Sequence, residues 1–291
     1  MHPAPSIIVF TAISGLGFGL LAWLGVGVPD VTGWSAFAFF FIAYALAAGG
    51  LMASAFHLGH PERAFKAFSQ WRSSWLSREA VLSVATLLAF GPYALALWLF
   101  ETRLGLLGAV GSLLALATVF STSMIYASLR AVPRWNHWLV PTLFLLYAIS
   151  GGALLSGEIY AAALLFLVLA GAQLLYWRTG DKLFHAAGST AETATGLGFM
   201  GKVRQLEPPH TGPNYLLKEM VFVVGRRRAE RLRLIALLSG AILPALVLSI
   251  VPAGHLAAAV AVLLHVIGLL AARWLFFAEA EHVVGLYYGR R

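Results

Sequence analysis

A dense group of polar and charged residues separates two long apolar runs, and it holds the side chains of this chain best suited to chemistry. The stretch from His57 to Glu79, HLGHPERAFKAFSQWRSSWLSRE, contains two histidines, four basic residues and two glutamates. Charged groups are costly near lipid and are usually retained there for function. His57 ends one apolar run and Glu79 begins the next. We therefore expect a histidine and a carboxylate to face each other at one edge of a membrane.

That combination is typical of proton and electron exchange with a quinone. A quinone ring needs hydrogen-bond partners for its oxygens and a route for two protons. Histidine titrates near neutral pH, and a glutamate can serve as a general acid or base. Arg63, Ser77 and Arg78 are the neighbouring groups that could orient the ring or these two side chains. The simpler alternative is that His57 caps a helix and that Arg78 and Glu79 are ordinary interface anchors.

The composition predicts that these groups belong to a membrane protein that spans the bilayer many times. Of the 291 residues, 60% are hydrophobic and only 11% are charged, whereas soluble domains carry about a quarter of charged residues. A spanning helix needs roughly 20 apolar residues, and the runs lack the alternation of a β-barrel. We predict an all-α integral membrane protein, one membrane domain over residues 1–291, with a long loop at 178–232. Its eight-transmembrane-helix bundle is predicted at 6–26, 34–57, 79–100, 105–129, 138–155, 159–177, 233–252 and 255–277.

Lysine and arginine are distributed very unequally between the two sides of this bundle. Eight spans put both termini on one side, together with the connections 58–78, 130–137 and 178–232. That side, called the basic side below, carries 19 of the 20 basic residues, and only Arg103 lies opposite. The positive-inside rule predicts that the basic side and both termini are cytoplasmic. The same asymmetry accounts for the net charge of +8 without a nucleic-acid partner.

Three arginines in the long loop, Arg226, Arg227 and Arg228, stand just before an apolar run. They could contact anionic membrane lipid or form a docking surface for a cytoplasmic partner, and the two roles are compatible.

Several kinds of site are not expected in this chain. It has no cysteine, so it cannot hold an iron–sulfur cluster through thiolates or form a disulfide. Only His265 lies near the middle of a run, so it should be a packing residue, and neither a metal site nor a haem with two histidine ligands is expected. A shallow haem held by two of His57, His60, His137 and His185, all near the basic side, is the alternative. Arg273, Glu279, Glu281 and His282 lie on the basic side and could close over the same site beside His57 and Glu79, but we expect them to form an ordinary solvated helix end. The run centres are nearly free of charge, which argues against a transporter.

The loop signature HLG-x-P-x-R-A-F followed by S-x-E, together with the eight-span plan, resembles the membrane anchor subunits of the dimethyl sulfoxide reductase family. The C-terminal RWLFFAEAEHVVGLYYG is weakly similar to the end of those anchors. The resemblance implies a quinone-binding anchor without haem, which holds an iron–sulfur electron-transfer subunit and a molybdopterin catalytic subunit. The quinol-site histidine of the family falls on His57 and its essential glutamate on Glu79.

Within that family, the chain is most similar to anchors of cytoplasm-facing, sulfite-oxidising complexes, on the segments ATGLG and LEPPHTGPNYLLKEM. The resemblance implies that a partner oxidises sulfite and that electrons reach ubiquinone or menaquinone beside His57 and Glu79, in a bacterial inner membrane. Three alternatives stay open: a menaquinol-oxidising anchor of a dimethyl sulfoxide reductase-type enzyme, a non-catalytic anchor, and a small-solute transporter.

Overall fold

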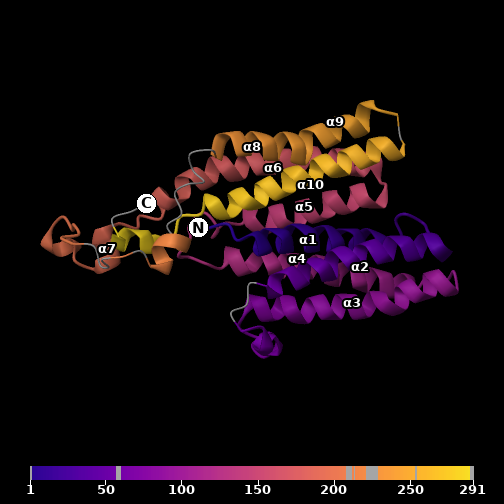
Figure 1. Ribbon diagram of the computed structural model, residues 1–291, viewed down its shortest axis with the longest axis horizontal. Helices are drawn as coiled ribbons and strands as arrows, with labels where there is room; N and C mark the ends of the chain where they lie inside the picture. Colours follow the sequence, from indigo (N-terminus) through magenta and orange to yellow (C-terminus); the bar gives the residue numbers. More distant parts are fainter. Residues whose placement is uncertain are drawn as a thin grey trace.

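The computed structural model describes residues 2–56, 60–207, 212, 214–220, 229–252 and 254–288. It contains eight helical units that are long and apolar enough to cross a membrane, as predicted, and no strand occurs in the ranges just given. Figure 1 shows them lying roughly side by side along the long axis of the molecule. They are α1 (Pro5–Gly25), α2 (Gly33–Ala55), α3 (Trp75–Leu99), α4 (Gly105–Ala127), α5 (Leu139–Ser156), α6 (Ile159–Ala186), a unit made of α8 (Ala229–Leu237), the π-helix η5 (Leu238–Ile242) and α9 (Leu243–Ile250), and α10 (His255–Ala278).

Two helices are longer on the basic side than the apolar runs predict. Helix α3 begins at Trp75, so Ser77 and Arg78 belong to its first turns and not to the preceding loop. Helix α6 continues to Ala186 and carries Asp181 with it. Hydropathy marks where a chain leaves the lipid, but a helix ends only where its backbone hydrogen bonding ends. Both extensions place charged residues on rigid helical backbone.

Helix α1 lies at the centre of the bundle, where it packs against α2, α4 and α5. Its glycines permit these close contacts. A Cβ atom on Gly19 would lie 1.8 Å from the carbonyl oxygen of Ala148 in α5, and one on Gly17 would lie 2.3 Å from the nitrogen of Ala47 in α2. Small residues are favoured where membrane helices approach closely, because packing drives their association. Gly17 and Gly19 thus serve contacts inside this chain.

The remaining helices divide on either side of α1. Helices α2, α3 and α4 form one half, with α3 packed on α4, and α5, α6, α8–α9 and α10 form the other. The turn between α5 and α6 is tight: Gly157 ends α5 with a left-handed φ of 84°, and α6 begins at Ile159.

A small lobe extends beyond the helix ends on the basic side. It is formed by α7 (Ala191–Thr195), η2 (Gly198–Met200), η3 (Leu216–Met220) and the C-terminal η6 (Val283–Tyr288), and Figure 1 shows it next to both termini. The Tyr287 hydroxyl donates to the Ala194 carbonyl oxygen at 2.6 Å, and the Asn214 amide donates to the Tyr288 hydroxyl at 3.0 Å. The long loop is thereby folded against the end of the chain.

Candidate functional site

Two parts of the predicted site lie outside the described residues. They are His57 and the arginines Arg226, Arg227 and Arg228. Their roles remain predictions, and the geometry of the site starts from Glu79.

Glu79 is buried near the basic-side end of α3, with only 4% of its surface exposed. Its side chain faces α4, where the hydroxyl of Thr122 donates a hydrogen bond to Oε1. Deeper in the bundle, the hydroxyls of Thr86 and Thr118 lie 3.1 Å apart across the same pair of helices. Glu79 therefore sits at the basic-side end of a polar seam between α3 and α4. A carboxyl group in that position can exchange protons only with a neighbour that reaches into the bundle.

The other predicted residues of the loop lie around this carboxyl group but not against it. Ser77 is buried, at 3% exposure. The Arg78 guanidinium stacks 4.3 Å from the ring centre of Trp75 and donates to the carbonyl oxygens of Trp71 at 3.1 Å and Arg72 at 2.6 Å. Arg78 thus holds the end of the loop against the start of α3.

Arg63 lies on the short 3₁₀ helix η1 (Pro61–Phe68), most of whose side chains are exposed. Its Nε is 3.9 Å from Oε1 of Glu62, with both side chains more than 60% exposed. An exposed pair of this kind contributes little to stability. The sequence-predicted group is therefore split between a buried part, Ser77 and Glu79, and a surface part, Arg63 and Arg78.

Sequence reasoning did not single out Tyr126, which lies one helical turn from Thr122 on α4 and is 9% exposed. Its phenol is within electrostatic range of both Glu79 and Arg273. The Tyr126 ring centre is 5.9 Å from that of Phe144, and the Arg273 guanidinium lies 3.6 Å from the same Phe144 ring. Tyr126 is therefore close both to the Glu79 carboxyl group and to a second polar group, around Arg273.

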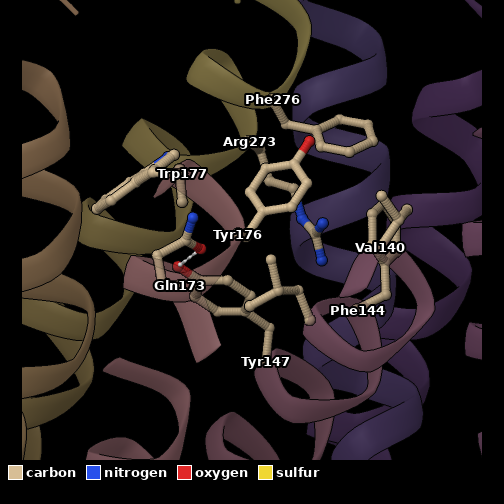
Figure 2. Close-up of a pocket in the computed structure, with 10 residues that line it drawn as sticks. Val140, Phe144, Tyr147, Gln173, Tyr176, Trp177, Arg273 and Phe276 are labelled. Atoms are coloured by element: carbon tan, nitrogen blue, oxygen red, sulfur yellow. Dashed lines mark hydrogen bonds between the residues drawn. The ribbon is translucent and has the colours of Figure 1, made fainter. Parts of the chain in front are cut away.

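That second group lines a small cavity between α5, α6 and α10, called the Arg273 cavity below (Figure 2). Its polar lining residues are Arg273, Tyr147, Gln173 and Tyr176. The Tyr147 hydroxyl donates to Oε1 of Gln173 at 3.1 Å, drawn as a dashed line in Figure 2. The cavity has about 10 Å³ of space for a water molecule, which is room for about one.

The expectation that the C-terminal helix end is solvated is wrong for two of its residues. Arg273 is 4% exposed and Glu279 is 6% exposed, because α5 and α8 pack over the last turns of α10. Two features of the sequence could have indicated this buried polar group. Arg273 stands inside an apolar run, and Gln173 and Tyr176 lie three residues apart on one helix face.

Glu279 belongs to a cluster of two arginines and two carboxylates, called the basic-side charge network below. Arg134 donates to Glu279 at 3.2 Å and also to Asp181. Arg233 donates to Glu279 at 2.7 Å and to Asp181 at 2.6 and 2.8 Å. The network joins the connection before α5, the extension of α6, and helices α8 and α10. The network has two positive and two negative groups, and it links the basic-side ends of these helices.

His265 is a buried packing residue, as predicted, at 1% exposure. Its Nδ1 lies 2.7 Å from the carbonyl oxygen of Gly240, and its ring centre is 4.8 Å from that of Phe166.

The chain matches a family model over more than half of its length and a known relative over nearly all of it. The family model described as DMSO reductase anchor subunit (DmsC) matches residues 6–174. A sulfite dehydrogenase subunit of Allochromatium vinosum is 33% identical over an alignment of 325 positions, which covers 99% of this chain and 99% of the relative. No solved structure gives a significant match.

Proposed function

Because the chain belongs to the family of DMSO reductase anchor subunits, we propose that it is the quinone-reactive anchor of a sulfite-oxidising molybdoenzyme complex. As an anchor subunit it is part of a multisubunit oxidoreductase with catalytic and electron-transfer partners. In this proposal a molybdopterin subunit oxidises sulfite, and an iron–sulfur subunit brings the electrons to the basic side, which faces the cytoplasm of a bacterium. This chain then passes them to the quinone pool of the inner membrane.

The full-length similarity to a subunit of a sulfite dehydrogenase supports the substrate of the partner. The absence of cysteine supports the division of labour, since a chain without thiolates must receive electrons from another chain. The basic-side lobe offers a surface for that partner, and the arginines Arg226, Arg227 and Arg228 are proposed to contribute to it.

The observation that carries the quinone part of the proposal is the burial of Glu79 beside Thr122. A quinone, when bound, supplies a two-electron and two-proton acceptor. Glu79 would pass a proton to a ring oxygen, and Thr122 would hold the carboxyl group in position. His57 would hydrogen-bond the other ring oxygen and supply the second proton, while Ser77, Arg63 and Arg78 would shape the entrance. Burial limits the groups that can exchange protons with the carboxyl group, and after each transfer Glu79 would take a new proton from the basic side, as a relay requires.

Replacing Glu79 by Gln tests the relay, because the amide keeps the shape but cannot release a proton. In the purified complex, the rate of quinone reduction by sulfite should fall by about a hundredfold, in line with the loss of one acid–base group. The rate with an artificial dye that accepts electrons from the iron–sulfur subunit should stay unchanged. Glu101→Gln, on the opposite side, is the matched control and should keep both rates. A normal quinone rate in Glu79→Gln would rule out the relay.

A further inference from the structure

Arg273 places a full positive charge inside the bundle without a carboxylate ion pair among the residues that the structure describes. Its close contacts are aromatic: the guanidinium carbon lies 3.6 Å from the ring centre of Phe144 and 5.3 Å from that of Tyr147. Its Nε has no hydrogen-bond partner in the described part of the chain. Aromatic faces attract a cation, but they do not neutralise it. A buried charge without a counter-charge is costly and calls for a partner.

The neighbouring carboxylates do not supply that partner. Glu279 and Asp181 are both engaged by Arg134 and Arg233, and the basic-side charge network they form has two positive and two negative groups. The charged or titratable groups that act electrostatically on Arg273 are three phenols: Tyr126 from α4, Tyr147 from α5 and Tyr176 from α6. Glu79 lies beyond Tyr126 and forms no ion pair with Arg273, so the guanidinium has no counter-charge in contact with it among the described residues.

Figure 2 shows the polar groups around the Arg273 cavity, each of which can donate a hydrogen bond. The Tyr176 hydroxyl is buried and has no partner among the described residues, like Nε of Arg273. The Gln173 amide oxygen already accepts from Tyr147, which leaves its NH₂ group as the donor on that side. A ligand that accepts from the guanidinium, phenol and amide groups would satisfy them together, and a negative ligand would also balance the charge of Arg273.

The size of the cavity limits the ligand further. It has room for about one water molecule, whereas pockets for ring-sized ligands span several hundred Å³. The space excludes a quinone head group and any polyatomic anion as large as sulfate. A halide ion is only slightly larger than a water molecule and fits with a small shift of the side chains.

We propose that the Arg273 cavity binds one small monovalent anion, chloride in the first instance, as a fixed counter-ion to Arg273. The ion accepts hydrogen bonds from Arg273, Tyr176 and Gln173 and so connects α10 with α6. Because it binds only the folded bundle, it stabilises that state by mass action. The site is separate from the Glu79 relay and does not depend on it.

Thermal unfolding of the purified complex tests the proposal, in potassium chloride or potassium gluconate at equal ionic strength. The unfolding midpoint should rise with chloride concentration and then saturate, bromide should replace chloride, and sulfate should not. An equal midpoint in chloride and gluconate, or an equal rise with sulfate, would overturn the proposal.

Two substitutions of Gln173 sharpen the test because one supplies a tethered counter-ion. Gln173→Glu should raise the midpoint in gluconate and remove the response to chloride. Gln173→Met removes the amide donor without adding charge and should weaken the chloride response without abolishing it, because Arg273 and Tyr176 remain. Arg273→Gln should also remove the response to chloride. If that variant does not assemble, the two Gln173 variants still test the proposed site. A Gln173→Glu variant that keeps the full chloride response would contradict the proposed site.

Discussion

At the scale of single residues, the contact between Thr122 and Glu79 has the most direct consequence for activity. Thr122→Val removes the hydroxyl that donates to the carboxyl group while keeping the volume. Leaving a buried polar group without its hydrogen bond costs about 1–3 kcal/mol, so we expect quinone reduction by sulfite to slow by roughly tenfold. The rate with a dye acceptor should not change.

Thr118→Val is the matched control for this change. Thr118 lies one turn deeper on α4 and contacts Thr86 instead of Glu79. Its quinone rate should stay within about twofold of wild type, the effect of a few tenths of a kcal/mol. Equal losses in the two variants would mean that packing of the seam, and not the contact with Glu79, sets the rate.

The basic-side charge network gives a second prediction at this scale. The Glu279 side chain is 5% exposed and binds both Arg134 and Arg233, whereas the Asp30 side chain, paired with Arg103 on the opposite side, is 87% exposed. Glu279→Gln leaves buried arginines short of a partner and should lower the free energy of unfolding by about 3–5 kcal/mol. Asp30→Asn should change it by less than about 1 kcal/mol. Detergent-induced unfolding of the reconstituted chain measures both, and similar losses would contradict the burial argument.

A residue can be recognised from the sequence when its own segment makes it unusual, but not when its role depends on contacts with other segments. Glu79 is recognisable because a carboxylate that begins an apolar run is unusual in itself. Arg273 also stands in an apolar run, yet its burial depends on α5 and α8 packing over α10. The direction in which Glu79 faces, towards Thr122, depends on α4. Residue type is visible in one segment, but the partner of a side chain is a tertiary property.

At the scale of helices, α1 is the element on which the others depend, and its glycines allow a matched pair of substitutions. Gly19→Ala would force a Cβ to within 1.8 Å of the Ala148 carbonyl oxygen, while a Cβ on Gly15 meets nothing within 4 Å. Gly19→Ala should separate α1 from α5 and lower the unfolding midpoint clearly. Gly15→Ala should leave it unchanged or raise it, since alanine favours a helix by about 0.5–1 kcal/mol over glycine. The same midpoint in both variants would show that this contact is not limiting.

The number and order of the helices could be predicted because apolar length alone decides whether a segment can span the lipid. Their ends on the basic side could not. The residues that extend α6 past 177 include Arg178, Asp181 and Lys182, which hydropathy assigns to a loop. Asp181 remains helical because Arg134 and Arg233 hold it, and both come from other segments.

At the scale of the whole molecule, the uneven distribution of basic residues predicts the orientation in the membrane. A fluorescent protein fused after Arg291 should fold and fluoresce, because that terminus is proposed to be cytoplasmic. Alkaline phosphatase inserted at the turn formed by Gly157 and Glu158 should be active, because that turn is proposed to face the periplasm. The reverse pattern would overturn the orientation and with it the cytoplasmic partner.

The partners and the direction of electron flow are the properties that this chain reveals least, because they are set by other subunits.

The spans need only their own apolar residues, whereas the lobe combines residues from 191–220 with residues from 283–288. Sequence patterns therefore predict the membrane spans well but not the lobe, whose parts are far apart in the sequence.

The composition of that lobe also fixes an order of events during synthesis. The Tyr287 hydroxyl closes on Ala194, and the backbone N–H of Val283 donates to the carbonyl oxygen of Ala131. These contacts cannot form until the ribosome has finished α10 and the residues after it. A soluble partner that recognises the closed lobe would therefore meet only completed anchors, and a nascent or truncated chain would present no finished surface to it.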